Sequence, residues 1–142
     1  MALSERDTEF LRGHSSAAMI TVGSDGVAKV ARVGIALVDD ALRSSGARDR
    51  VRTARLRRDP HCTLFVFDPG FAWLALEATV TILDGADAAK HNLRLFREMQ
   101  GKPTGSLSWF GNDLDEEQFL RVMIDEQRLI YEFAVDRTYG LY

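Results

Sequence analysis

The chain has 142 residues and a net charge of −3, and it is 46% hydrophobic and 27% charged. These values fit one globular domain over residues 1–142 and exclude a disordered or fibrous protein. Its apolar stretches are far shorter than the roughly 20 residues that a membrane-spanning helix needs, so no membrane partner is expected. The single cysteine, Cys62, excludes an internal disulfide, and the acidic first residues indicate no secretory signal, so we expect a cytoplasmic protein.

The first part of the chain is predicted to be a short helix followed by strands. Ser4 and Asp7 have the spacing of a helix-capping box, and Gly13 is placed to end that helix. Residues 17–22 and 27–38 flank a glycine-containing turn, which predicts a hairpin. Both faces of its second strand are largely apolar or small, which predicts coverage on both sides, in a closed barrel or at a subunit interface. A short strand follows at 41–45.

The second part is predicted to contain three more strands and three helices. An arginine-rich helix ends before Pro60, because the residue before a proline disfavours helical geometry. Strands are predicted over 61–67, 71–83 and 127–135, and helices over 86–99 and from the acids at 113–117 to 124, with a loop over 101–111. In the strand at 71–83 the alternation predicts a core face of Leu74, Leu76, Ala78, Val80 and Ile82. Trp73 lies on the opposite face, which suits a cofactor wall or a dimer contact.

These elements contain no repeat and no linker. Six β-runs combined with helices predict a mainly β protein of the α+β class, built as a small barrel with helices around it.

Positive charge is concentrated in one segment. Residues 43–58 hold seven arginines against one acid, Asp49, so the segment carries +6 and the rest of the chain −9. The preceding Ser44-Ser45-Gly46 offers hydroxyls and backbone N–H groups at the start of a helix, which is typical of a phosphate site. A solvated basic helix face is the alternative. Nucleic acid is not expected as a partner, because no aromatic residue is interleaved with the arginines.

No catalytic group or metal site stands out in the sequence. The three histidines and Cys62 have no metal-ligand spacing, and no nucleotide-binding loop or nucleophile motif occurs. The acids at 113–117 are explained by helix capping, so no metal is expected. An enzyme of this kind would depend on a cofactor for its chemistry.

Several of these features together resemble a known family. They are the run Arg52-Thr53-Ala54-Arg55-Leu56-Arg57-Arg58-Asp59-Pro60, the strand that ends in Ser44-Ser45-Gly46, the residues 71–78, and Thr138-Tyr139-Gly140-Leu141. In this order they resemble the flavin/deazaflavin oxidoreductase superfamily, which has the fold of pyridoxamine 5′-phosphate oxidase, and within it the small actinobacterial proteins that bind coenzyme F420. The resemblance implies a six-stranded antiparallel split β-barrel of the FMN-binding type, and a homodimer with the cofactor at the subunit interface.

The resemblance also implies a set of site residues. Ser45, Arg50 and Arg52 would hold the cofactor phosphate. Val33 and Gly34 would lie beside the ring, and Trp73 would come from the partner subunit. The complete expected cofactor site is Arg32, Val33, Gly34, Ser44, Ser45, Arg50, Arg52, Arg55 and Trp73. The sequence departs from the family pattern where Arg52 replaces a lysine, Arg55 an asparagine and Ala78 a glycine.

The function implied by the resemblance is that of an F420-dependent oxidoreductase. It would transfer a hydride from the reduced deazaflavin to an activated double bond of a small organic substrate. The alternatives are an FMN-binding enzyme similar to pyridoxamine 5′-phosphate oxidase, and a non-catalytic protein that binds or carries F420.

Overall fold

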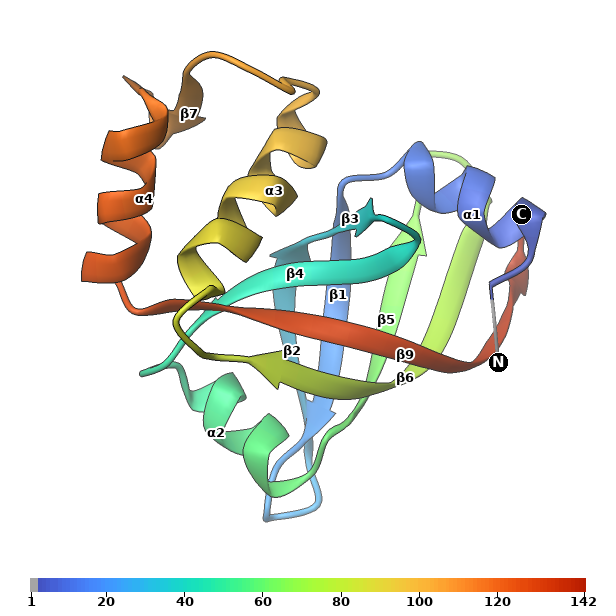
Figure 1. Ribbon diagram of the computed structural model, residues 1–142. Coiled ribbons are helices and arrows are strands. Elements are labelled where there is room, and N and C mark those ends of the chain that lie inside the picture. Colours follow the sequence, from blue (N-terminus) through green and yellow to red (C-terminus); the bar gives the residue numbers. More distant parts are fainter. Residues whose placement is uncertain (1–2) are drawn as a thin grey trace.

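A computed structural model describes residues 3–142, which form four helices, a curled seven-stranded sheet and a small two-stranded sheet (Figure 1). In chain order the elements are α1 (Glu5–Arg12), β1 (Ser16–Val22), β2 (Ala28–Gly34), β3 (Ala36–Val38), β4 (Ala41–Ala47), α2 (Val51–Arg58), β5 (His61–Phe67), β6 (Trp73–Leu83), α3 (Ala88–Gln100), β7 (Leu107–Trp109), β8 (Asn112–Leu114), α4 (Glu116–Asp125) and β9 (Arg128–Leu141). The large sheet is antiparallel, with the order β2-β1-β5-β6-β9-β4-β3. The mainly β class with helices is confirmed.

The number of strands differs from the prediction of six, because the extended run over residues 27–38 forms two strands. β2 pairs with β1 as far as Gly34, and β3 pairs with β4 from Ala36 onward. Ile35 lies between the two ladders, and its N–H donates to the Ser15 carbonyl at 3.0 Å. One run therefore supplies both edges of the sheet. A period-two pattern cannot show where a strand changes its partner.

β2 is also less covered than the sequence predicts. Val30, in the middle of this strand, is 68% exposed, although Val33 near its end is buried in the core. Within one chain the outer face of β2 is therefore open.

Two further differences lie in the second half of the chain. The predicted loop over 101–111 contains β7, which forms a hairpin with β8 through a turn where Phe110 and Gly111 both have positive φ. The last strand extends to Leu141 instead of ending at Val135. It stays paired with β6 from Ile130 to Leu141 because a bulge between Glu77 and Ala78 absorbs one extra residue of β9.

The predicted helix signals are confirmed. The Ser4 hydroxyl accepts from the Asp7 N–H, and the Asp7 carboxylate accepts from the Ser4 N–H. The acids before α4 act in the same way, with Asp115 as the N-cap. α2 begins only at Val51, with Arg50 as its N-cap residue.

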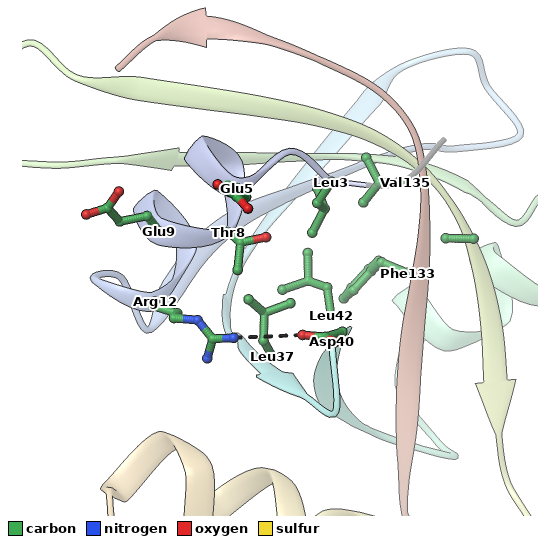
Figure 2. A pocket seen from close by; sticks show the side chains of 11 residues that line it. Leu3, Glu5, Thr8, Glu9, Arg12, Leu37, Asp40, Leu42, Phe133 and Val135 are labelled. Atoms are coloured by element: carbon green, nitrogen blue, oxygen red, sulfur yellow. Dashed lines mark ion pairs between the residues drawn. The ribbon is translucent and has the colours of Figure 1, made fainter.

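The core lies on the inner side of the curled sheet, and the predicted core face of β6 is confirmed, with Leu74 and Leu76 fully buried. α3 packs on β3, β4 and β9, and α4 packs against α3 (Figure 1). α1 covers one end of the half-barrel and leaves a cavity there (Figure 2). No helix within residues 3–142 is long and apolar enough to span a membrane.

Candidate anion-binding site

The structure divides the seven arginines of residues 43–58 into two groups. Five of them donate to acceptors of the protein itself: Arg43 to Glu132, Arg48 and Arg57 to Asp84, Arg55 to the Thr21 hydroxyl, and Arg58 to the Val22 carbonyl. Within the described part of the chain, Arg50 and Arg52 make no such bond. The five hold the fold together, and the other two are available to a ligand.

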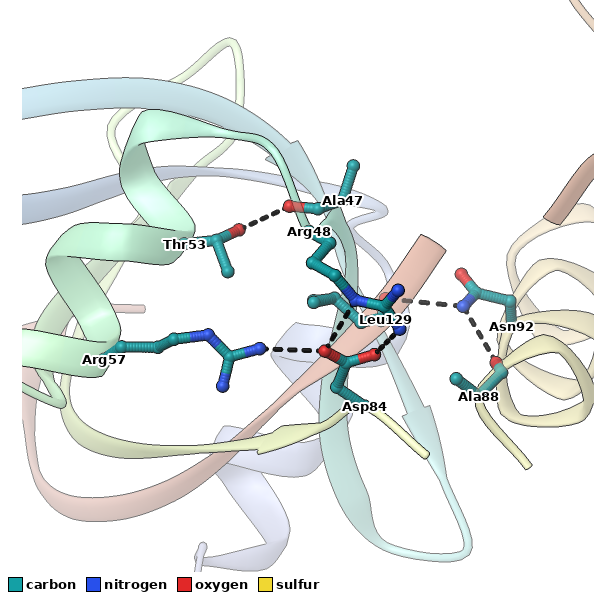
Figure 3. Close-up of polar contacts among 8 residues, drawn as sticks. All are labelled: Ala47, Arg48, Thr53, Arg57, Asp84, Ala88, Asn92 and Leu129. Atoms are coloured by element: carbon teal, nitrogen blue, oxygen red, sulfur yellow. Dashed lines mark hydrogen bonds and ion pairs between the residues drawn. The ribbon is translucent and has the colours of Figure 1, made fainter. Parts of the chain in front are cut away.

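Asp84, at the end of β6, holds α2 in place (Figure 3). It accepts hydrogen bonds of 3.0 and 2.6 Å from Arg48, before the helix, and one of 2.9 Å from Arg57, in its last turn. The hydrogen bond from Arg48, together with the positive charges of both arginines, lowers the pKa of Asp84. The carboxylate is only 13% exposed, so both ends of α2 are tied to one nearly buried charge.

The first turn of α2 is held by a second contact, to the buried Tyr131 of β9. The Thr53 hydroxyl bonds to the Ala47 carbonyl at 2.7 Å and to the Tyr131 hydroxyl. The Tyr131 ring packs directly on Gly46, where a Cβ atom would lie 2.5 Å from the tyrosine oxygen. The junction between β4 and α2 is thus closely packed, and it presents Arg50 and Arg52 from a fixed backbone.

Arg128, at the start of β9, joins these two arginines and was not identified from the sequence. Burial lowers the pKa of Arg128, the charge of Glu126 raises it, and the charges of Arg50 and Arg52 lower it further, so both arginines act on Arg128. The Nε atoms of Arg52 and Arg128 are both buried without a hydrogen-bond acceptor among residues 3–142. Buried donors without an acceptor are costly, and an anionic group beside them would remove that cost.

A groove of about 550 Å³ runs past this cluster. Its lining residues are Ala47, Asp49, Arg50, Val51, Asp125, Glu126, Gln127 and Arg128. Glu126 Oε1 lies 3.6 Å from Arg128 Nε, which is an ion pair but not a hydrogen bond. Three carboxylates share the groove with Arg50 and Arg128, and Arg52 lies outside its lining. The donors present there fit a phosphate or carboxylate group.

Three other predicted site residues already have structural roles or are enclosed. The Ser45 hydroxyl donates to Asn92 Oδ1 of α3 at 2.5 Å, away from the arginines. Ser44 is fully buried. Arg55 donates to Thr21 at 2.9 Å. Cofactor binding by these residues stays a prediction. For Ser45 and Arg55 it would require each side chain to give up its present hydrogen bond and form one with the cofactor.

The remaining predicted site residues lie on β2 and β6. On β2, Arg32 is exposed and Val33 is buried in the core, while a Cβ on Gly34 would overlap Met99 of α3. Trp73 packs against Phe65 and Tyr139, at the opposite end of β6 from the arginine site. At about 3.3 Å per residue, roughly 33 Å of strand separates Trp73 from the far end of β6. A single chain therefore does not bring Trp73 to the arginines, and its role from a partner subunit stays a prediction.

Nothing in the motifs of the sequence marks Arg128. It lies outside the arginine-rich segment, and only the pairing of β9 with β4 brings it to the start of α2. Residues 3–142 contain no cluster of three or more His, Cys, Asp or Glu side chains that could hold a metal ion.

Comparison with solved structures finds proteins of similar fold. The conserved hypothetical protein Rv2991 of Mycobacterium tuberculosis is 17% identical, with a TM-score of 0.75, over 99% of this chain and 86% of that one. An F420 reductase is 16% identical, with a TM-score of 0.68, over 96% and 98%. General Stress Protein 26 of Bacillus anthracis is 14% identical, with a TM-score of 0.66, over 94% and 89%. At these identities the likeness establishes the fold alone.

Comparison with curated proteins found no match. The model of the pyridoxamine 5′-phosphate oxidase family, in contrast, matches residues 3–132. Because this match spans most of the chain and the fold agrees with it, the chain belongs to the pyridoxamine 5′-phosphate oxidase family.

Proposed function

We propose that the protein is a cytoplasmic oxidoreductase that binds coenzyme F420 through the acidic side chain of the cofactor, at Arg50, Arg52 and Arg128. The observation that carries this proposal is the pair of buried Nε donors, on Arg52 and Arg128, that have no acceptor among the described residues. Family membership supports a flavin-type cofactor, and a solved F420 reductase has a similar fold.

The number of available arginines favours F420 over FMN. Arg50 and Arg52 both repel the charge of Arg128, and a ligand with several anionic groups neutralises these three arginines better than FMN, which carries a single phosphate. FMN stays the alternative cofactor, since the family is that of pyridoxamine 5′-phosphate oxidase. A carrier that binds F420 without turnover is the second candidate, because no acid, base or nucleophile stands out in the sequence.

In this proposal the chain supplies binding and orientation. When bound there, reduced deazaflavin would be the hydride donor for reduction of an activated double bond in a small organic substrate. The arginines neutralise the anionic side chain and hold it in place. Asp84 and Tyr131 fix α2, so the arginines are oriented before the ligand arrives and little is lost in ordering them.

The proposal includes a homodimer, formed by the outer face of β5, β6 and β9. This face carries Phe65, Phe67, Trp73, Tyr139 and Leu141, and both Phe67 and Leu141 are about 60% exposed. Neighbouring exposed aromatic and aliphatic side chains favour burial against a second copy. Burial of this face against a second copy of the chain would also enclose Trp73. This is expected for a residue that lies beside the cofactor bound to the other subunit.

A fluorescence titration of the purified protein with F420 and, separately, FMN tests the cofactor. We expect F420 to bind more tightly, with an affinity that falls at high salt. Replacing Arg52 with alanine should weaken F420 binding by about 1.5–3 kcal/mol, as for a charge-assisted hydrogen bond. Arg58→Ala is the matched control on the same helix, because Arg58 donates to the Val22 carbonyl; it should change the affinity less than twofold.

The outcomes separate the candidates. Tight binding of FMN with none of F420 would reject the F420 proposal in favour of the alternative. Equal affinities of the Arg52→Ala and Arg58→Ala variants would remove the arginine cluster from the site. Binding of F420 without turnover of a panel of enones would favour the carrier.

A further inference from the structure

We propose that Trp109, in β7, is a positioning residue of the arginine site. Its indole ring holds the guanidinium group of Arg128 away from Glu126 and leaves the N–H donors of Arg128 open to a ligand. This inference rests on the anion binding of the proposed function and not on the identity of the cofactor. It extends that function, because Trp109 lies neither in the arginine segment nor in the lining of the groove.

The Arg128 side chain makes no hydrogen bond within residues 3–142, and an aromatic ring holds it instead. Its guanidinium carbon lies over the Trp109 ring, 5.1 Å from the ring centroid. An indole face attracts a cation at this distance, and more strongly where water is excluded. The side chain is only 12% exposed. Because contact with a ring uses no hydrogen-bond acceptor, the N–H groups of Arg128 stay available to an anion.

Glu126 competes with a ligand for Arg128. Its Oε1 atom lies 3.6 Å from Arg128 Nε, which is an ion pair beyond hydrogen-bond distance. A guanidinium group released from the ring would need to move only a short way to form a charge-assisted hydrogen bond with this carboxylate. That bond would occupy donors that an anion needs. The contact with Trp109 therefore favours the arrangement in which Arg128 is ready to receive a ligand.

The Trp109 ring is itself fixed by the two helices beneath the hairpin. It packs edge-to-face on Phe96 of α3 and Phe119 of α4, with ring centroids 5.2 and 5.8 Å apart. The Gln100 side chain, at the end of α3, bonds to both the N–H and the carbonyl of Ser108, each at 2.9 Å. The hairpin is not part of the large sheet, so these contacts set where the ring lies. A ring held in this way can orient a flexible side chain.

A double-mutant cycle tests the inference, with inorganic pyrophosphate as the probe because its binding does not depend on which cofactor the protein uses. Affinities are measured by isothermal titration calorimetry at low salt. Trp109→Leu should weaken binding about three- to tenfold, the range expected for a partly desolvated cation–π contact. In the Arg128→Ala background the same substitution should change the affinity less than about twofold, because the residue through which Trp109 acts is absent.

Two further variants separate positioning of Arg128 from packing of the hairpin. Trp109→Phe keeps an aromatic face and should recover most of the affinity that Trp109→Leu loses. Phe110→Leu is the matched control, because Phe110 contacts Trp109 in the same hairpin but is 86% exposed. It should leave the affinity unchanged.

NMR spectroscopy of the unmodified protein gives a second readout, which decides the matter even if Trp109→Leu does not fold. Titration with pyrophosphate should shift the indole N–H signal of Trp109 together with the Nε–H signal of Arg128, with the same midpoint. A ring that contacts Arg128 senses the ligand through it, although the ring does not line the groove.

Three results would overturn the inference. They are equal losses from Trp109→Leu in both backgrounds, a Trp109→Phe affinity as low as that of Trp109→Leu, and an indole signal that stays in place. Failure of pyrophosphate to bind the unmodified protein would reject the arginine site and this inference with it. Binding of pyrophosphate, with the expected variant effects but without binding of F420 or FMN, would reject the proposed cofactors and support the role of Trp109.

Discussion

Replacing Gly46 with alanine tests the packing that positions the arginine site. An alanine Cβ would lie 2.5 Å from the Tyr131 hydroxyl oxygen, 2.7 Å from its Cε2, and closer still to its Cζ. Tyr131 is fully buried and its hydroxyl bonds to Thr53, so the ring cannot move without breaking a buried contact. Overpacking costs about 1–3 kcal/mol, and disturbing the buried hydrogen bond costs a similar amount. We expect Gly46→Ala to lower the free energy of unfolding by about 2–5 kcal/mol.

Urea unfolding followed by circular dichroism measures this loss. Gly85→Ala is the matched control, because no heavy atom lies within 4 Å of the Cβ it would add, and it should change stability by less than about 0.5 kcal/mol. In a double-mutant cycle, Tyr131→Leu should recover at least about 1 kcal/mol of the cost of Gly46→Ala. A loss no larger than that of Gly85→Ala, or strict additivity with Tyr131→Leu, would refute the steric argument.

Three further predictions concern other parts of the fold. The pKa of Asp84 is lowered by Arg48, so its stabilising effect is present above the unfolded pKa near 4 and is lost as the pH falls through the lower folded value. Asp84→Asn should therefore reduce the Tm by about 2–4 °C at pH 7, and this difference from the unmodified protein should shrink below pH 4; a pH-independent difference would contradict it. Burial raises the pKa of Cys62 to about 12, so iodoacetamide should label it at pH 8 at least about 100-fold more slowly in the folded protein than in urea, by mass spectrometry. A Cβ on Gly140 would overlap the Trp73 carbonyl oxygen, so Gly140→Ala should cost about 2–3 kcal/mol in urea unfolding, and an unchanged midpoint would refute the close approach.

Local signals in the sequence predicted local structure well. The capping box at Ser4 and Asp7 and the helix end at Gly13 depend on residues within one or two turns, so the sequence contains all the information they need. The core face of β6 follows in the same way from a period of two, because Leu74 and Leu76 face the same side of any strand.

The predicted strand bounds were wrong where the bounds depend on which neighbouring strand a segment pairs with. The run over 27–38 is uniformly extended, but Gly34 and Ala36 belong to different ladders because β1 and β4 lie at different places in the sheet. The tail after Val135 begins with Asp136 and Arg137 and contains Gly140, and it forms a strand because β6 is long enough to pair with it.

The cluster of positive charge after Ser44-Ser45-Gly46 and the resemblance to a family of flavin and deazaflavin proteins can both be found without a structure. Which arginines are available to a ligand depends on the folded chain. Asp84, Glu132, Thr21 and Val22 lie far from the arginine segment in the chain and occupy five of its guanidinium groups. Arg128 joins the other two for the same reason: charges meet across a folded sheet according to strand pairing, which no local pattern records.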